Sequence, residues 1–121
     1  MAGIGVDLVE IARLAAAMRR REGFAEMAFT TGERSYAGRR HPAKRFAACF
    51  AAKEAFLKAV GVGLWGGVPL QEVEVVHEVS GQPRLRLGPL AERALRRKGC
   101  SSTLLSLSHE KRAAVAVVLV Q

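Results

Sequence analysis

Aromatic residues are scarce in this sequence, where one Trp, one Tyr and five Phe make up 6% of 121 residues. Half of the residues are nevertheless apolar, so we expect a core that is packed mainly from Ala, Val and Leu. Cysteine is also scarce, because Cys49 and Cys100 are the only two and do not have the spacing of metal ligands. We expect both cysteines to be small core residues.

Long apolar runs are missing too. No stretch approaches the roughly 20 apolar residues that cross a bilayer, and Met1 leads directly into AGIGVDL without the start of a signal peptide. A cytoplasmic protein is therefore expected. Because the 121 residues contain no repeat, low-complexity tract or linker, we predict a single domain over residues 1–121.

The common phosphate-binding and nucleophile motifs are also absent. AVGVG lacks the Gly-Lys-Ser/Thr ending of a P-loop, GIGVDL is not a Gly-x-Gly-x-x-Gly turn, and no Gly-x-Ser-x-Gly elbow occurs. Positive charge, in contrast, is abundant, since 19 Lys and Arg against 11 Asp and Glu give a formal charge of +8. This excess favours an anionic partner: a nucleic acid, a phosphorylated small molecule, an acidic protein or an anionic membrane.

The apolar pattern predicts an α+β fold, with a small antiparallel sheet and helices packed against one side of it. In the first half of the chain we predict a short buried strand over residues 3–8 and a helix over residues 9–21. Thr30 or Thr31 is expected to cap a short helix whose first turn contains Glu33. The clearest helix starts at Pro42 and ends at Gly61.

The second half of the chain predicts strands around one helix. The alternation in EVEVVHEV, the turn SGQP and the strand RLRL indicate a hairpin, in which Gly81 can adopt a positive φ. A helix is expected between Pro89 and Gly99. The segments TLLSLSH and AAVAVVLV then predict two strands that are joined by a tight turn around His109 to Arg112.

Four polar residues in this pattern are candidates for chemistry, each with a structural alternative. Asp7 ends an apolar strand, where it caps the next helix or binds a metal that compensates its burial. Glu54 and Lys58 are four residues apart, which suits a surface brace of about 0.3–0.5 kcal/mol, although the apolar helix around them also suits a site. His109 closes LLSLS, either as a structural histidine or as a functional one.

Basic residues gather on the predicted helix over residues 9–21. Arg13 and Arg20 are seven residues apart and so share a face, with Arg21 nearby. This face is either an ordinary solvated surface or a docking site for an acidic helix or a phosphate backbone.

Four segments occur in one order along the chain: GIGVDLVEIARL, FAAKEAFLKAVGVG, SGQPRL and LSLSHEKRAAVAVV. Together they resemble the holo-acyl-carrier-protein synthase family, the short class of 4′-phosphopantetheinyl transferases, over almost the whole chain. The resemblance implies a Mg²⁺-dependent transfer of 4′-phosphopantetheine from coenzyme A to a serine of apo acyl carrier protein, with release of adenosine 3′,5′-bisphosphate. It also implies lipid metabolism, and fatty acid biosynthesis in particular, as the setting.

The resemblance also implies roles for residues that match the family motifs. Asp7 and Glu54 would bind Mg²⁺ together with coenzyme A diphosphate oxygens and water, which are ligands that a hard cation prefers. Lys58 would reach the transferred phosphate, and His109 would complete the catalytic set. The seryl proton would pass to Glu54 directly, or to a water near the metal that a carboxylate deprotonates.

Further matches concern binding and assembly. The coenzyme A site would include Lys58, Gly61, Pro83, Ser108 and His109, with the Gly81–Pro83 turn beside the adenine. Arg13, Arg20 and Arg21 would face the acidic helix of the carrier protein. The family forms trimers with sites between neighbouring subunits, so His109 would serve a metal site that another chain completes.

One position departs from the family pattern. Cys49 stands where many members carry Arg before Phe-Ala-Ala, and Arg45, one turn earlier, is a possible substitute for a coenzyme A contact. The competing hypothesis from another class is a small basic nucleic-acid-binding module, which the charge favours. That hypothesis leaves Asp7 and Glu54 unexplained, and few aromatic residues are available to stack on bases.

Overall fold

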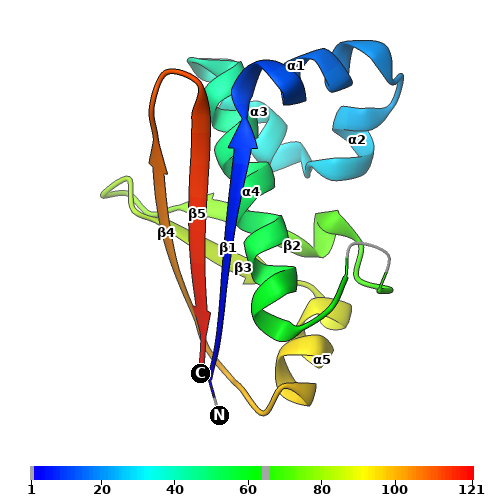
Figure 1. The fold of residues 1–121 in the computed structure, drawn as a ribbon, viewed down its shortest axis with the longest axis vertical. Coiled ribbons are helices and arrows are strands. Elements are labelled where there is room, and N and C mark those ends of the chain that lie inside the picture. The colour runs from blue at the N-terminus through cyan, green and yellow to red at the C-terminus, as the bar shows by residue number, and fades with distance from the viewer. Residues whose placement is uncertain (1, 64–65) are drawn as a thin grey trace.

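A computed structural model describes residues 2–63 and 66–121 of the chain, and Figure 1 shows how they are arranged. The predicted α+β class is confirmed. The elements follow in the order β1 (Gly3–Glu10), α1 (Ile11–Arg20), α2 (Phe24–Ala28), α3 (Thr31–Arg39), α4 (Pro42–Val60), the 3₁₀ turn η1 (Leu70–Glu72), β2 (Val73–His77), β3 (Pro83–Leu87), α5 (Pro89–Arg97), β4 (Thr103–His109) and β5 (Ala113–Val120).

The strands form two antiparallel sheets rather than the single sheet that the sequence predicts. A three-stranded sheet has the order β1-β5-β4, and β2 pairs with β3 in a separate two-stranded sheet. Alternation along a segment identifies a strand but not its neighbours, and this is why the sequence did not separate the two sheets. In Figure 1 the hairpin β2–β3 crosses behind the large sheet, where β3 contacts β4 and β2 contacts α4.

The large sheet buries one face against α4 and leaves the other face open in the chain. On β5, Ala114, Ala116, Val118 and Val120 are all buried on the helix side. On β1 the opposite face exposes Ile4, Val6 and Leu8, which are 69%, 55% and 68% exposed. The expected short buried strand over residues 3–8 is therefore corrected to a longer strand, Gly3–Glu10, with only one buried face.

The first helix begins later than predicted, and Asp7 is not its cap. Helix α1 starts at Ile11 with Glu10 in the N-cap position. Pairing of β1 with β5 continues as far as Glu10 and Ala113, and the Ile11 amide donates to the Arg112 carbonyl at 2.8 Å. This ladder keeps the backbone extended beyond residue 7, so the capping interpretation of Asp7 is wrong.

Other local predictions are confirmed. Thr30 caps α3 in a reciprocal capping box with Glu33. Gly61 ends α4 at φ 76° and Gly81 turns the hairpin at φ 93°, conformations that favour glycine. Both cysteines are buried in the core. Across residues 2–63 and 66–121, every helix is too short or too polar to cross a membrane.

Candidate active site

The close contact between β1 and α4 positions the predicted metal residues. A Cβ atom added at Gly5 would lie 2.0 Å from the Ala55 carbonyl oxygen and 2.7 Å from the Ala59 amide nitrogen. Only glycine allows this approach of strand and helix. Since side chains alternate along a strand, Asp7 leaves β1 on the same face as Gly5, toward α4.

Lys58 joins the strand to the helix. Its Nζ atom donates to Asp7 Oδ1 at 2.9 Å and to the Val6 carbonyl oxygen at 3.1 Å. The Asp7 side chain is 11% exposed, whereas the Lys58 side chain is 56% exposed. The structure therefore uses Lys58 to compensate a largely buried carboxylate on another element, and not as a surface brace within α4.

Glu54 completes this group of residues. Burial raises the pKa of the Glu54 carboxyl, the negative charge of Asp7 raises it further, and Lys58 lowers it in part. The carboxyl groups of Asp7 and Glu54 provide hard oxygen ligands for a cation. Within the part of the chain that the structure describes, no group of three or more His, Cys, Asp or Glu could hold a metal. Two carboxylates are a donor set that fits a cation whose remaining ligands come from substrate and water.

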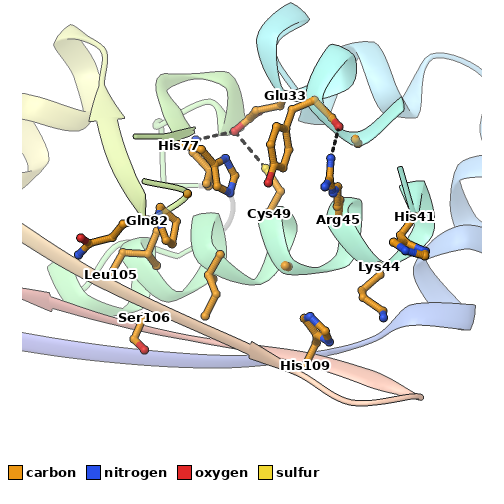
Figure 2. Close-up of a pocket in the computed structure, with 17 residues that line it drawn as sticks. Glu33, His41, Lys44, Arg45, Cys49, His77, Gln82, Leu105, Ser106 and His109 are labelled. Atoms are coloured by element: carbon orange, nitrogen blue, oxygen red, sulfur yellow. Dashed lines mark hydrogen bonds between the residues drawn. The ribbon is translucent and has the colours of Figure 1, made fainter. Parts of the chain in front are cut away.

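A second group of predicted residues lies around a cavity of about 590 Å³ on the other side of α4. Pro83 and His109 line this cavity, and so does Arg45. Figure 2 shows His109 and Arg45 directed into it from β4 and α4. Arg45 and Glu54 are nine residues apart, or two and a half turns of about 3.6 residues, so they leave α4 on opposite sides.

Stacked rings form one wall of this cavity, and the sequence reasoning missed them. The Tyr36 and His77 rings stack with centroids 3.9 Å apart. The Arg45 guanidinium lies 4.1 Å from the Tyr36 ring centroid and donates to the Tyr36 carbonyl oxygen at 2.8 Å. Burial and then the Arg45 charge lower the pKa of His77. A lone Tyr and a strand His, 41 positions apart, carry no signal of this pairing in the sequence.

The cavity is suited to an anion. Its lining includes the basic or titratable side chains of His41, Lys44, Arg45, His77 and His109. The lining carboxylate of Glu33 is paired with the buried ammonium of Lys53 at 2.8 Å. The net charge around the cavity is therefore positive.

The remaining predicted site residues lie outside these two groups. Gly61 caps the C-terminal end of α4, three residues after Lys58. Ser108 is exposed on the face of β4 opposite to His109, because neighbouring side chains alternate. Arg13 is exposed and 3.6 Å from Glu10, Arg20 is exposed, and the Arg21 guanidinium is 5.9 Å from the Phe24 ring centroid.

The two groups belong to opposite edges of the large sheet. Asp7 on β1 and Leu107 on β4 are both paired with Ala116 on β5, which separates the two edge strands by about 10 Å. Helix α4 lies between the cavity and the group formed by Asp7, Glu54 and Lys58, which we call the acidic group. Within one chain, the acidic group therefore lies on a different side of α4 from the cavity.

Comparison with known proteins decides the family. A family profile described as the 4′-phosphopantetheinyl transferase superfamily matches residues 3–118. The chain belongs to this superfamily. The resemblance that the four sequence segments carry is thereby confirmed.

Members of the superfamily match the chain from end to end. A holo-acyl-carrier-protein synthase of Geobacter sp. (strain M21) is 40% identical, over 98% of this chain and 97% of that protein. The crystal structure of the synthase from Neisseria meningitidis has a TM-score of 0.88 at 33% identity, over 98% of this chain and 97% of that one. A coenzyme A complex of the Chronobacterium ammoniagenes enzyme has a TM-score of 0.85 at 30% identity, over 100% and 97% of the two chains.

Proposed function

We propose that this chain transfers 4′-phosphopantetheine from coenzyme A to a serine hydroxyl of apo acyl carrier protein, giving holo acyl carrier protein and adenosine 3′,5′-bisphosphate. The observation that carries the proposal is the convergence of Asp7, Glu54 and Lys58 where β1 meets α4. A pair of carboxylates beside an ammonium is suited to phosphoryl transfer, which depends on positioning and on neutralising charge.

The residues present fit a magnesium ion. Asp7 and Glu54 would hold it, because Mg²⁺ commonly takes one or two protein carboxylates and completes its shell with phosphate oxygens and water. Burial and then the negative charge of Asp7 raise the pKa of Glu54, and a bound cation would offset both effects by favouring the ionised carboxyl. When bound, Mg²⁺ supplies Lewis-acid neutralisation of the diphosphate charge.

The chain's own residues account for the remaining chemistry. The serine oxygen attacks the phosphorus that carries pantetheine, and the bond from that phosphorus to the bridging oxygen breaks. The electron pair leaves with adenosine 3′,5′-bisphosphate, and the serine proton passes to Glu54. Glu54 has this role in the proposal because its carboxyl lies beside Lys58, the residue that reaches the transferred phosphate. The half-exposed Lys58 ammonium reaches the transferred phosphate from the end of α4.

The nucleotide part of coenzyme A occupies the basic cavity of a neighbouring subunit in this proposal, beside Pro83 and His109. Two observations support a site shared between subunits: the cavity and the acidic group lie at opposite edges of the sheet, and the outer sheet face is apolar. That face exposes Ile4, Val6, Leu8, Leu104 and Val117, and exposed apolar surface of this kind marks an interface. The resemblance makes the assembly a homotrimer.

Subunit mixing tests the shared site. Glu54→Gln and His109→Ala homotrimers should each be inactive or strongly impaired, because every site lacks either the Glu54 carboxylate or the His109 imidazole. After mild dissociation and reassembly together, mixed trimers contain sites with both residues intact, so activity should return. Mixtures that stay as inactive as the two separate variants would show that Glu54 and His109 do not serve sites from different subunits.

The carrier protein docks through Arg13 and Arg20 on α1 and through Arg21 at its C-cap, and α1 follows directly after β1, the strand that carries Asp7. A net charge of +8 supports an acidic partner. We place the protein in the cytoplasm, where the buried thiols Cys49 and Cys100 stay reduced.

The reaction itself is tested by mass. Incubation with apo acyl carrier protein, coenzyme A and Mg²⁺ should add one phosphopantetheine to the carrier protein, and omission of Mg²⁺ should stop the gain. A Ser→Ala carrier protein is the matched control. An unchanged carrier mass with the intact chain, under conditions in which an authentic synthase reacts, would reject the proposal.

A further inference from the structure

Beneath the cavity lies a buried ion pair that the mechanism above does not use. Glu33 on α3 and Lys53 on α4 are 2.8 Å apart, with side chains 2% and 0% exposed. Taking two charges out of water costs more than a simple salt bridge returns unless further hydrogen bonds satisfy both groups. The surroundings of this pair supply such bonds.

Both groups are saturated with partners. Glu33 accepts from the Thr30 amide at 2.8 Å, from the Cys49 thiol at 3.0 Å and from the Val75 amide at 2.7 Å, as well as from Lys53. The Lys53 ammonium uses its other two protons on the carbonyl oxygens of Leu70 and Val73, each at 2.8 Å. The pair consequently links α3, α4, η1 and β2 at one point.

The same atoms form part of the cavity wall. Glu33, Cys49 and Val75 all line the cavity, and Figure 2 shows the hydrogen bond that the Cys49 thiol donates to Glu33. Along β2, His77 lies two residues beyond Val75, and β3 returns from the Gly81–Pro83 turn. The position of these walls relative to α4 therefore depends on the Glu33–Lys53 pair.

The two sides of α4 are held by different means. Toward the sheet, the contact of Gly5 with Ala55 and Ala59 is packed backbone against backbone. Toward the hairpin, β2 and β3 pair only with each other among the described residues. Because a two-stranded sheet is marginal without outside support, the hairpin depends on side-chain packing against β4 and α4 and on the buried ion pair. Loss of the ion pair should therefore move α3 and the hairpin, while Asp7, Glu54 and Lys58 stay in place.

We propose that Glu33 and Lys53 are positioning residues for the coenzyme A nucleotide: they fix α3 and the β2–β3 hairpin against α4 and so set the width of the basic cavity. The inference rests on the proposed function, because it assigns the cavity to coenzyme A. Loss of the ion pair should weaken binding of the nucleotide without slowing the chemical step, because Asp7, Glu54 and Lys58 lie on the opposite side of α4.

The test is Lys53→Met in the full-length assembled protein, which removes the ammonium and keeps a long unbranched side chain. KM for coenzyme A and Kd for adenosine 3′,5′-bisphosphate by calorimetry should rise about tenfold, as for the loss of one charged hydrogen bond. The kcat at saturating coenzyme A, its Mg²⁺ dependence and KM for the carrier protein should change less than about twofold, because α4 stays on the sheet.

Leu95→Ala on α5 is the matched control, because Leu95 is 1% exposed and its truncation also destabilises the fold. It should lower Tm without a change in KM for coenzyme A. Glu33→Gln, which keeps size and one acceptor oxygen, provides the same test if Lys53→Met does not fold. Normal nucleotide affinity in the folded variant, or an equal rise of KM in Leu95→Ala, would overturn the positioning role. Absence of transfer by the unsubstituted chain would instead reject the proposed function.

Discussion

Replacement of Gly5 by Ala should abolish most of the activity while the protein stays folded. The new Cβ would lie 2.0 Å from the Ala55 carbonyl oxygen, and real Cβ atoms essentially never come closer than 3.0 Å to another heavy atom. The neighbours at residues 55 and 59 are backbone atoms, so rotation of a side chain cannot relieve the overlap. Strand β1 and helix α4 must separate by at least about 1 Å.

That displacement has different consequences for stability and for catalysis. Overpacking of a well-packed contact costs about 1–3 kcal/mol, which is less than the roughly 5–15 kcal/mol that keeps a domain folded. The same 1 Å moves Asp7 away from Lys58 and Glu54, and a misplacement of this size can reduce a rate by about 100-fold. The loss of kcat should therefore be much larger than unfolding explains.

The assay is the initial rate of phosphopantetheine transfer by mass, with circular dichroism and Tm on the same samples. Gly38→Ala is the matched control, because a Cβ at residue 38 meets nothing within 4 Å and Ala stabilises a helix by about 1 kcal/mol relative to Gly. It should keep full activity. If Gly5→Ala is folded and retains the kcat and Mg²⁺ dependence of the unsubstituted chain, the close approach does not create the site.

Three further outcomes follow from the same structure. Burial and the Asp7 charge raise the pKa of Glu54 in the folded protein, so ionisation of this carboxyl destabilises the fold. Glu54→Gln should therefore raise the metal-free Tm at pH 8 but not below about pH 4, where the carboxyl is protonated in both states. An unchanged Tm at pH 8 would contradict this. Burial raises the pKa of Cys49, which should react with iodoacetamide far more slowly in the native protein than in denaturant, as peptide mass spectrometry measures; equal rates would refute its burial. Charge reversal of Arg13 and Arg20 should raise KM for the carrier protein and leave coenzyme A binding alone, and an unchanged KM at low salt would exclude docking there.

Features that depend on neighbours in the chain could be predicted from the sequence. Thr30 and Glu33 form the expected capping box because the two residues are one helical turn apart. Gly61 and Gly81 adopt positive φ where a helix ends and a hairpin turns. The end of β1 was predicted less well, because the ladder with β5, over 100 residues away, extends the strand to Glu10.

Contacts between distant elements explain what the sequence could not reveal. The family motifs predicted that Asp7, Glu54 and Lys58 form one site, which stays a prediction, and the structure places Lys58 Nζ 2.9 Å from Asp7 Oδ1. The Tyr36–His77 stack and the Glu33–Lys53 pair each join elements whose packing depends on the whole fold. Glu33 is an ordinary capping residue in the sequence, and its second role becomes visible only when β2 and α4 surround it.

Helix α4 has few charged residues among its apolar ones. A helix that is covered by a sheet on one side and by a hairpin on the other has little room for charge, because each buried charge needs a partner. Each of its charged residues has a specific place: two line the basic cavity, one forms the buried pair and two belong to the acidic group, namely Lys44, Arg45, Lys53, Glu54 and Lys58. The weak polar periodicity of this helix follows from this arrangement, because small residues pack α4 on β1 and its charges lie only at the cavity, in the buried pair or beside Asp7.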